Sequence, residues 1–401
     1  MSGILMNIKD EVLKEKQTTI NLRRELHKIP EPGFEEFKTS GFISEKLTGY
    51  GLDVKTGAAK TGVIGNLISK QFNNKSGNKR KTIMLRADID ALPIQEKSNI
   101  DYISTHKGYM HACGHDGHIA IALTAAKILS SHKNELKGNV KFVFQPAEEY
   151  QGGAKPMIEE GVLHNPEVNS AIGLHIWNSI PSGKVGIRKG PLMASVDNFK
   201  IKIIGKSSHG AMPHEGVDSI VIASYIINSI QTIITREINP VTPCVITIGK
   251  ISGGSASNII AEEVYLEGTA RTLNQDLNSI IFQKMEKIIK GITECMNAKY
   301  EFDYDFLYPV TVNNDEMTQV VYEAACEAVG AENIIEPEQS MGGDDMAYYL
   351  QKIPGCYFFL GSSNKEKGID FPLHSNNFNF DEGCLPIGVE IIIRTILKSL
   401  K

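Results

Sequence analysis

The chain has 401 residues and a formal net charge of −5, and its composition is 41% hydrophobic and 22% charged. With a pI of about 6.2 and a mean hydropathy of −0.16, it has no general attraction to nucleic acid or anionic lipid, and we expect neither as a partner. Its length predicts two or three domains. The first ten residues lack a charged n-region and a long apolar core, and the apolar stretches are too short to span a bilayer, so we expect a cytoplasmic protein.

The first 190 residues alternate predicted helices and strands. Helical periodicity covers residues 8–29 and ends at the turn 30–33, and a second helix is expected over 35–47. The other predicted elements of this part are strands 63–64, 82–85, 140–144 and 171–176, the polar loop 73–81, and a helix that begins at Asp116. Strands that alternate with helices are typical of an α/β sheet with parallel segments.

The pattern changes near Pro191. The elements predicted from there are strand 196–204, helix 217–236, strands 244–251 and 264–273, helix 276–297 and strand 300–308. This βαββαβ order predicts a ferredoxin-like α+β unit that is inserted into the α/β domain. Helix 317–329, strand 356–360 and helix 386–400 then resume the first pattern. The predicted domains are therefore an α/β domain of residues 1–190 and 309–401, and an inserted unit of residues 191–308.

One segment, His111-Ala-Cys-Gly-His-Asp-Gly-His118, contains a thiol, three imidazoles and a carboxylate. Cys113 and His115 are two residues apart, so they cannot share one helix face and instead fit a strand-to-helix loop, where open α/β sheets bind ligands. Thiolate and imidazole are good ligands for transition metals. The sequence therefore predicts a metal site here. The other five cysteines are scattered, and we expect them to be small buried hydrophobes.

Two adjacent carboxylates, Glu148 and Glu149, follow the predicted strand 140–144 directly. Adjacent side chains point in different directions, so one can bind a metal while the other takes a proton from a metal-activated water. The alternative is a solvated pair at the start of a helix, where carboxylates interact favourably with the helix dipole.

Three further residues in the α/β part are candidates. His175 interrupts an apolar strand, and is either a metal ligand or a hydrogen-bonded core histidine. Asp88, at the carboxyl end of strand 82–85, either hydrogen-bonds a ligating imidazole or ends a turn. His374 lies in a turn-rich stretch and is unremarkable by itself. The segment 342–345, Gly-Gly-Asp-Asp, is a nest-like turn near the site, a simple connection or a helix cap.

In the inserted unit, His209 lies in a turn rich in glycine and serine and could donate a hydrogen bond to an oxyanion. Asn258 lies in a polar loop that could approach a ligand, and Arg271 could bind a carboxylate through both guanidinium nitrogens. For each of the three, a plain surface role is the alternative.

Seven motifs, spread nearly end to end, resemble those of a known family. They are Arg86-Ala-Asp-Ile-Asp-Ala-Leu-Pro, His111-Ala-Cys-Gly-His-Asp-Gly-His, Gln145-Pro-Ala-Glu-Glu, Gly173-Leu-His, Ser208-His-Gly-Ala-Met-Pro-His, Gly268-Thr-Ala-Arg-Thr and Gly342-Gly-Asp-Asp-Met. Through them the chain resembles the N-acyl-amino-acid amidohydrolases of the aminoacylase/carboxypeptidase metallopeptidases. Relatives in this branch include hippurate hydrolases, indole-acetyl-amino-acid hydrolases and N-acetyl-diaminopimelate deacetylases.

The resemblance implies a zinc-exopeptidase-like catalytic domain with an inserted lid and dimerisation domain, and a homodimer or a dimer-based homo-oligomer. It implies a site for two divalent metal ions, with Cys113 as a candidate bridge between them. The implied ligands are Cys113, His115, Glu149, His175 and His374. The other implied roles are general base for Glu148, partner of the metal ligands for Asp88, oxyanion donor from either subunit for His209, and substrate contacts for Asn258 and Arg271. The wider group has a metal-binding histidine where this chain has Arg86, so its ligands are not carried over.

Together these expectations predict a metal-dependent amidohydrolase that cleaves the amide bond of an N-acyl-L-amino acid, with a metal-activated water and Glu148 as general base. A metallo-exopeptidase, either a dipeptidase or a carboxypeptidase, could use the same site. Two further classes are a cysteine hydrolase based on Cys113 and a non-catalytic binding protein on the same scaffold. The mixed ligands suit zinc, manganese, nickel or cobalt.

Overall fold

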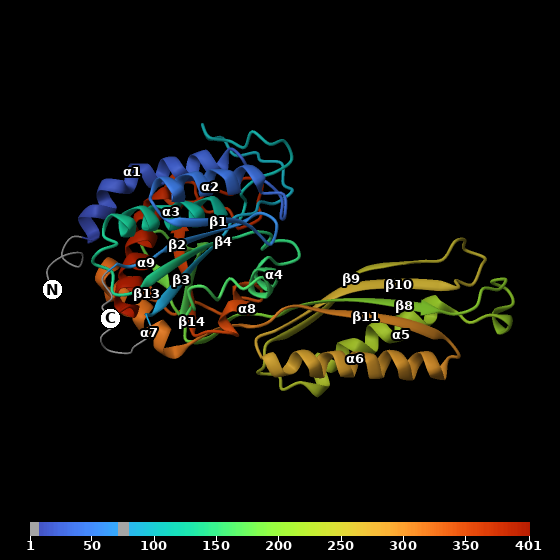
Figure 1. Cartoon of the computed structure of the whole chain (residues 1–401). Coiled ribbons are helices and arrows are strands. Elements are labelled where there is room, and N and C mark those ends of the chain that lie inside the picture. The colour runs from blue at the N-terminus through green and yellow to red at the C-terminus, as the bar shows by residue number, and fades with distance from the viewer. Residues whose placement is uncertain (1–7, 71–79) are drawn as a thin grey trace. The chain divides into compact units, whose positions relative to one another are not determined.

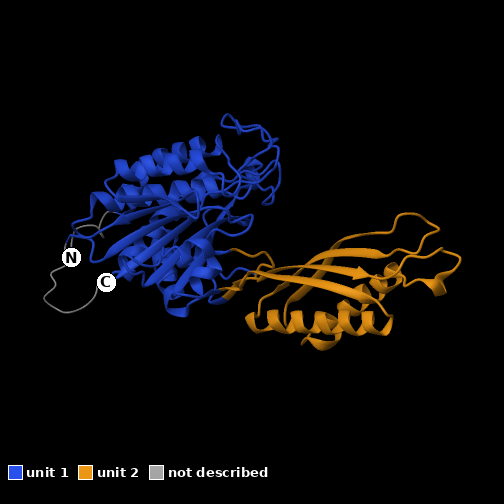
Figure 2. Ribbon diagram, turned by 45° about the vertical axis from the view of Figure 1, so that its right-hand side comes forward, with its two compact units in different colours: residues 1–190, 312–338, 345–401 blue, residues 191–311, 339–344 orange. Residues whose placement is uncertain are grey.

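The computed structural model describes residues 8–70 and 80–401, and the chain divides into two compact units. Unit 1 comprises residues 1–190, 312–338 and 345–401, and unit 2 comprises residues 191–311 and 339–344 (Figure 2). The boundaries predicted from sequence were 190/191 and 308/309, whereas the structure assigns residues 309–311 and 339–344 to unit 2 as well. The first seven residues and most of the predicted loop 73–81 lie outside the described residues.

An eight-stranded mixed sheet is the centre of unit 1, in the order β1-β2-β4-β3-β5-β14-β6-β13 (Figure 1). Its strands are β1 (Asp53–Ala58), β2 (Gly62–Leu67), β3 (Thr82–Asp88), β4 (Asn139–Gln145), β5 (Ser170–Pro181), β6 (Val185–Gly186), β13 (Ile334–Ile335) and β14 (Gly355–Ser363). The pairs β3–β4, β3–β5 and β5–β14 are parallel, as predicted. Every residue of β3, β4 and β14 is buried, which accounts for their nearly continuous apolar sequence.

The helices of unit 1 are α1 (Ile8–His27), α2 (Phe37–Gly49), α3 (His115–Ser131), α4 (Ala154–Glu159), α7 (Asp315–Val329), α8 (Met346–Leu350) and α9 (Leu385–Ser399). Contacts link α2 to α3, α3 to α9 and α9 to α7, so these helices form one continuous layer, and α1 packs on α3 and α9. The short helices α4 and α8 contact each other, and α8 packs on β14 and β5. No helix of the described residues is long and apolar enough to cross a membrane.

Unit 2 contains the six elements that the sequence predicted, in the order β8, α5, β9, β10, α6, β11. They are β8 (Val196–Ile204), α5 (Ser219–Thr232), β9 (Cys244–Gly253), β10 (Glu263–Thr272), α6 (Gln275–Cys295) and β11 (Lys299–Tyr308). The strands form an antiparallel sheet in the order β11-β8-β10-β9. Along β8, the side chains of Phe199, Ile201 and Ile203 are buried against α5 and α6, and the lysines between them face outward. This alternation is the signature of a sheet with one covered face.

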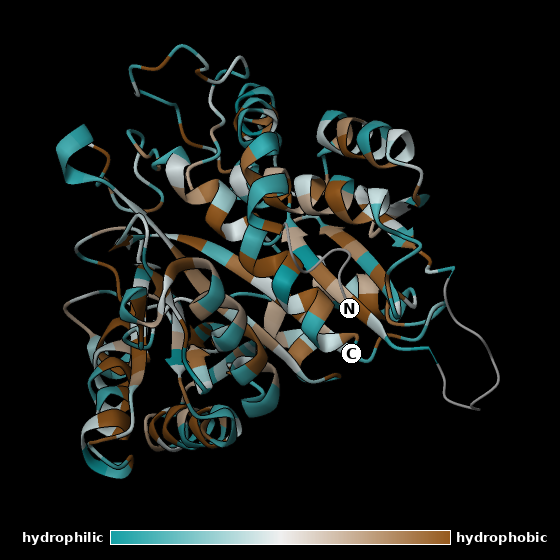
Figure 3. Cartoon of the chain, turned by 90° about the vertical axis from the view of Figure 1, so that its left-hand side faces the viewer, coloured by the Kyte–Doolittle hydropathy of each residue, from teal (hydrophilic) through white to brown (hydrophobic). Residues whose placement is uncertain are grey.

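Local chemistry decides where several helices begin. The Asp218 side chain accepts hydrogen bonds from the first amides of α5, and Asn274 and Asn314 do the same for α6 and α7. Hydrophilic and hydrophobic residues are mixed along the helices drawn in Figure 3, as expected for helices with one buried face. The predicted helix 217–236 is shorter at its start because of the Asp218 cap, and its last turn, Ile233–Glu237, is a π-helix.

The sequence patterns missed the shortest elements: β1, β6, β13, α4, α8, and the two-stranded sheet of β7 (Gly190–Met193) and β12 (Thr311–Asn313). Short 3₁₀ turns at Pro213–Glu215, Ala331–Asn333, Lys365–Lys367 and Glu382–Cys384 were also not predicted. Elements of two to six residues are too short to show a period. The expectation of five buried cysteines was wrong for Cys295, which is exposed, while Cys244 and Cys326 are half-buried.

Candidate active site

Parallel strands place polar residues at one edge of the large sheet. The register pairs Asp88 of β3 with Gln145 of β4, and Arg86 of β3 with Gly173 of β5, so that His175 lies level with Asp88. The Glu148–Glu149 pair begins three residues beyond the end of β4. The carboxyl ends of the strands therefore bring these side chains to the edge where open α/β sheets bind ligands.

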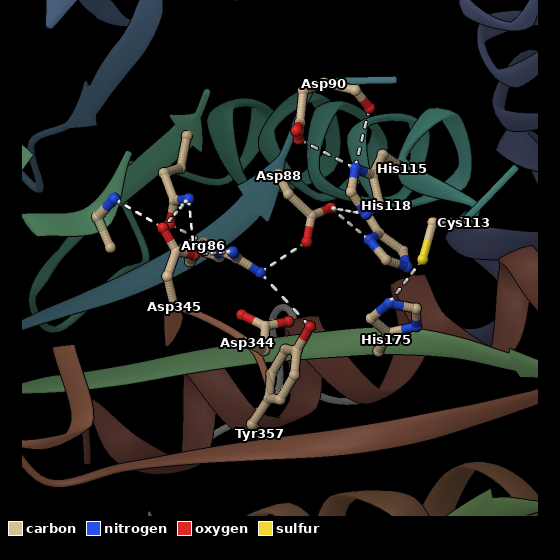
Figure 4. Close-up of polar contacts among 12 residues, drawn as sticks. Arg86, Asp88, Asp90, Cys113, His115, His118, His175, Asp344, Asp345 and Tyr357 are labelled. Carbon is tan, nitrogen blue, oxygen red and sulfur yellow. Dashed lines mark hydrogen bonds and ion pairs between the residues drawn. The ribbon is translucent and has the colours of Figure 1, made fainter. Parts of the chain in front are cut away.

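The six residues predicted as metal ligands or general base meet at this edge (Figure 4 shows part of the site). Three overlapping groups have ligand atoms within 4.8 Å of one another: Cys113, His115 and His175; Cys113, Glu149 and His374; and His115, Glu148 and Glu149. The residues come from four separate segments of the chain. Their convergence creates a compact set of one thiol, three imidazoles and two carboxylates.

His115 is the first residue of α3 and its ring is held by Asp90. Its Nδ1 lies 2.9 Å from the Asp90 carbonyl oxygen and 3.2 Å from Asp90 Oδ1, so Nδ1 carries a proton (Figure 4). The buried Nε2 makes no hydrogen bond within the described residues. Burial lowers the pKa of His115, but the carboxylates of Asp88, Asp90 and Glu149 outweigh it and raise the pKa to about 10. The surroundings of Nε2 therefore favour a positive charge, which a metal ion would also supply.

The other two imidazoles are also oriented. His175 Nδ1 lies 2.6 Å from the carbonyl oxygen of Ile176, which leaves Nε2 at 3.5 Å from the Cys113 sulfur. His374 Nε2 lies 3.0 Å from Glu149 Oε1, and the His374 amide donates to the Ala112 carbonyl. The His374 side chain is 52% exposed, so it lies on the open side of the site.

Cys113 is buried among negative groups. Burial, followed by the Glu149 and Glu148 carboxylates, raises the pKa of the Cys113 thiol well above its usual value. A catalytic thiolate needs the opposite environment, with a lowered pKa. A cation bound among these residues would instead stabilise the thiolate as a ligand. The donor set therefore fits one or more divalent metal ions and argues against Cys113 as a nucleophile.

Asp88 and His118 form a buried pair next to these groups. His118 Nδ1 lies 2.5 Å from Asp88 Oδ1, and His118 Nε2 accepts a hydrogen bond from the Ile176 amide at 2.8 Å. Both ring nitrogens of His118 are thus engaged by protein groups, and the ring joins α3 to β5. Asp88 Oδ1 lies 3.8 Å from His115 Nε2. The imidazole that Asp88 hydrogen-bonds in this structure is therefore that of His118.

Arg86 and Asp345 form a buried network that the sequence did not predict. Arg86 donates to Asp88 Oδ2 at 2.6 Å, to Asp345 Oδ1 at 2.7 Å and to Gln145 at 3.0 Å (Figure 4). Gln145 donates to both oxygens of Asp345, which also accepts from the Ala154 amide. A buried charge without its partner is strongly destabilising. The second aspartate of the Gly-Gly-Asp-Asp segment is thus a cross-link, and its contact with Arg86 spans 259 positions of sequence.

A second buried cluster lies around the first turn of α3. Asp116 Oδ2 accepts from Arg23 Nε at 2.8 Å and lies 2.8 Å from His27 Nδ1. Burial opposes ionisation of Asp116, but Arg23 and His27 hold its pKa well below the usual range. Burial lowers the pKa of the neighbouring His111 to about 3, and its ring makes no hydrogen bond among the described residues. Asp116 therefore anchors α3 to α1, away from the ligand groups.

The three candidates in unit 2 lie at two separate places. His209 and Asn258 are exposed and adjacent, because the Gly210 amide donates to the Asn258 carbonyl and His209 forms a bridge with Ile259. Arg271 is half-buried near the opposite end of β10, beside the Asp197 carboxylate, and burial lowers its pKa. His209 Nδ1 accepts from the Ala211 amide at 3.0 Å, which leaves Nε2 as the donor position of this tautomer.

The sequence predicted no individual role for Asp90, Gln145 or Asp345, although it indicated a turn near the site at 342–345. For Asp90 a signal existed, because it is two residues after Asp88 and strand alternation places both on one face. Gln145 and Asp345 gave no local signal of their roles, because their partners lie on distant segments of the chain.

The chain is similar to known metallopeptidases and amide hydrolases in both sequence and structure. The model of the family described as Peptidase family M20/M25/M40 matches residues 84–398. Thermostable carboxypeptidase 2 of Saccharolobus solfataricus is 40% identical over 96% of both chains. N-acetyl-L-cysteine deacetylase of Bacillus subtilis is 40% identical over 92% of this chain and 85% of its own. The crystal structure of the Bacillus subtilis YXEP protein, described as a dinuclear metal-binding peptidase of the M20 family, is 33% identical and covers 96% of this chain and 98% of its own, with a TM-score of 0.82.

The matched residues include every ligand candidate of unit 1, and both the sequence relatives and the solved structure extend over nearly the whole chain. The family model alone covers more than half of the sequence. The buried thiol, imidazole and carboxylate donors at the sheet edge are those expected of a metal-dependent hydrolase of amide bonds. The chain belongs to the peptidase family M20/M25/M40.

Proposed function

We propose that this protein is a metal-dependent amidohydrolase that removes the acyl group from N-acyl-L-amino acids. The observation that carries the proposal is the convergence of one thiol, three imidazoles and two adjacent carboxylates at the edge of the sheet. The proposed metal ligands are Cys113, His115, Glu149, His175 and His374. The deacetylase relative supports a small N-acyl amino acid as substrate.

Bound divalent ions would polarise the amide carbonyl and lower the pKa of a water molecule. Glu148 then takes the proton from that water and passes it to the leaving amine, which a carboxylate beside the ligands can do. Asp90 holds His115 with Nε2 toward the site, and Asp88 holds His118 between α3 and β5. His209 donates to the developing oxyanion, Arg271 binds the substrate carboxylate, and Asn258, which lies beside His209, contacts the substrate from the same side as His209.

We propose zinc, manganese, nickel or cobalt as the bound ion, because thiolate, imidazole and carboxylate ligands are compatible with each. The presence of two ions is supported by the related YXEP structure, which is described as dinuclear. We also propose a cytoplasmic location. None of the six cysteines forms a disulfide, and all six lie within the described residues, which agrees with a reducing compartment.

Substrate hydrolysis tests the proposed function. The purified protein, loaded separately with each of the four metals, should release amino acid from a panel of N-acetyl, N-benzoyl and indole-acetyl amino acids. Dipeptides and peptides with a free carboxyl end belong to the same panel. Hydrolysis of at least one N-acyl amino acid with a kcat/KM above that for every peptide supports the proposal, and hydrolysis of peptides alone contradicts it.

A carboxypeptidase is the second candidate, because the Saccharolobus solfataricus relative bears that name at 40% identity. The chemistry at the sheet edge is the same for both reactions, since both cleave an amide next to a free carboxylate. The two functions differ only in the group on the acyl side of the bond. The same panel therefore decides between them.

We propose that the protein acts as a homodimer through unit 2. Ile204 at the end of β8 pairs with Glu263 at the start of β10, and His209 lies beyond that pair. Arg271 lies eight residues further along β10, so at least about 27 Å separates the two residues at about 3.4 Å per residue. A small N-acyl amino acid cannot contact both within one chain, so this distance favours a His209, together with the adjacent Asn258, that comes from a second subunit.

The surface of unit 2 supports a second copy of the chain as the partner. Strand β9 is an edge strand whose outer backbone groups face no other strand of the sheet, and such edges favour pairing. Large apolar side chains are also exposed on α5 and on β9 itself: Ile220, Val221, Tyr225, Val245 and Ile251.

Subunit mixing tests whether His209 acts across the dimer. Chains with Glu148→Ala and chains with His209→Ala are each expected to be nearly inactive. If His209 serves the partner's site, mixing should restore about a quarter of the wild-type activity, because random hybrid dimers then contain one intact site. Activity that stays at the level of the separate variants after verified subunit exchange contradicts the proposal.

A further inference from the structure

Ala147, the residue before Glu148, has a backbone conformation that alanine rarely adopts. Its φ is +55°, in the left-handed region, and the residue is buried. That region costs a non-glycine residue roughly 1–2 kcal/mol, so the surrounding structure must hold it in place. Three hydrogen bonds do so: the Ala147 carbonyl accepts from the Gly152 amide at 3.0 Å and from the Tyr150 amide at 3.4 Å, and the Ala147 amide donates to Glu36 Oε1 at 2.9 Å.

Glu36 comes from a distant part of the sequence, directly before α2, and its side chain is fully buried. Its second oxygen accepts from the Thr61 hydroxyl at 2.5 Å. Burial, with a smaller contribution from Asp90, raises the pKa of Glu36 to about 7. Glu36 can hold the Ala147 amide in either protonation state. The Thr61 hydroxyl donates to the Glu36 carboxylate or accepts from the protonated acid, so Oε1 remains free to accept from the Ala147 amide.

The segment that carries Glu36 lies directly against the Ala147 turn. A methyl group added at Gly33 would lie 2.8 Å from the Ala147 Cβ and 2.6 Å from Tyr150 Cδ2. On the other side of the turn, the Glu149 amide donates to Asp90 Oδ2 at 2.9 Å. The amides on either side of Glu148 are thus held by two buried carboxyl groups, Glu36 and Asp90.

We propose that Glu36 is a positioning residue for Glu148: by holding the Ala147 amide, it sets the direction in which Glu148 leaves the main chain. The inference rests on the proposed role of Glu148 as general base. Adjacent side chains are oriented by the peptide between them, so a rotation at Ala147 moves Glu148 relative to the ligands. A displacement of about 1 Å at a reacting group can cost about 100-fold in rate. Glu36 itself does not contact the ligand groups and is not a catalytic residue.

Three substitutions of Glu36 separate the effect of its side-chain length from the effect of its charge. Glu36→Gln keeps the oxygen that faces the Ala147 amide and loses the titratable proton. Glu36→Asp keeps the charge but is one methylene too short for that contact, and Glu36→Ala removes the group. We expect kcat of Glu36→Gln within about threefold of wild type, and kcat of the Asp and Ala variants lowered about 10–100-fold. Because the substrate contacts are untouched, KM should change less than about threefold in all three.

Glu31→Ala is the matched control. Glu31 is a nearby buried carboxylate whose side chain accepts from Lys38 and Thr39 at the start of α2, and it does not contact the 147–149 turn. Its loss should lower the free energy of unfolding as much as the loss of Glu36, without lowering kcat. A second readout uses metal-free protein: amide hydrogen exchange of the segment 144–152 should accelerate in Glu36→Ala and Glu36→Asp, and stay unchanged in Glu31→Ala and Glu36→Gln.

The order of kcat decides the inference. The inference is supported if kcat is higher in wild type and Glu36→Gln than in Glu36→Asp and Glu36→Ala, with unchanged metal content in all of them. An active Asp variant beside an inactive Gln variant would show that charge rather than reach matters, and it overturns the proposal, as do equal rates in all variants. If Glu36→Ala does not fold, the Gln and Asp variants still give this order. Should Glu148→Ala itself remain active, the proposed role of Glu148 fails, whereas an inactive Glu148→Ala beside an active Glu36→Asp refutes only this inference.

Discussion

Glu148→Ala should keep its metal content and lose about 100-fold to 10,000-fold in kcat, the range that general acid–base catalysis contributes. The reason is that the two adjacent carboxylates have different proposed roles, with Glu149 as a metal ligand and Glu148 as the general base. Glu149 Oε1 lies 3.0 Å from His374 Nε2, and Glu149 shares a group with Cys113 and His374. Glu148 shares a group with His115 and Glu149, so its carboxylate lies close to these two proposed ligands. The measurement is steady-state kinetics together with metal analysis of the same sample.

Glu149→Ala is the matched comparison for that variant. It removes the neighbouring carboxylate from the same turn, and we expect it to lose bound metal as well as activity. Retention of metal and loss of turnover in Glu148→Ala, beside loss of both in Glu149→Ala, separates a base from a ligand. A near-normal kcat in Glu148→Ala would contradict the assignment of Glu148 as general base. Equal metal loss in both variants would make Glu148 a ligand instead.

Cys113→Ser should weaken metal binding by more than about 100-fold, since even residues that only support the ligands contribute about 10–100-fold to affinity. Activity should fall with metal content and return only in part when metal is in excess. The physical cause is the loss of a soft thiolate from a site where burial otherwise keeps the thiol protonated. Metal titration of the metal-free variant measures the affinity directly.

Cys326→Ser is the control, because Cys326 is a half-buried cysteine of unit 1 in α7, outside the ligand groups. It should bind metal as the wild type does. Chelator treatment completes the test: wild-type activity should disappear with the metal and return when metal is added. A cysteine hydrolase would keep its activity in chelator, and an unchanged metal affinity in Cys113→Ser would remove Cys113 from the ligand set.

The fold was predictable wherever a periodic pattern was long. The six elements of unit 2 and the parallel strands of unit 1 follow from alternation, helical periodicity and turn residues. The π-helical turn at 233–237 and the two-residue strands were not predictable, because they are decided by packing and by pairing with distant partners. The boundary of unit 2 includes 339–344 for the same reason: contacts in space, not composition, join that segment to it.

For the site, residue type and spacing were enough to select candidates. A Cys-x-His pair and adjacent glutamates have chemistry that shows in the sequence, because thiol, imidazole and carboxylate groups bind metals wherever they converge. His374, unremarkable by itself, became a candidate only through the resemblance to a family. Supporting residues have no such signature. Glu36 and Ala147 are 111 residues apart, and Arg86 and Asp345 are 259 apart. An ordinary glutamate or arginine acquires its role only through the partner that folding brings to it.

The sequence alone therefore predicted which side chains could bind metal and move a proton, and it determined that the architecture is an α/β domain with an inserted α+β unit. The tertiary structure decided which nitrogen of His115 and His175 faces the site, through Asp90 and the Ile176 carbonyl. It also decided that His118 is engaged at both ring nitrogens. The physical reason is that ligand identity is a property of a side chain, whereas tautomer, orientation and pKa are properties of its neighbours, which only the folded chain assembles.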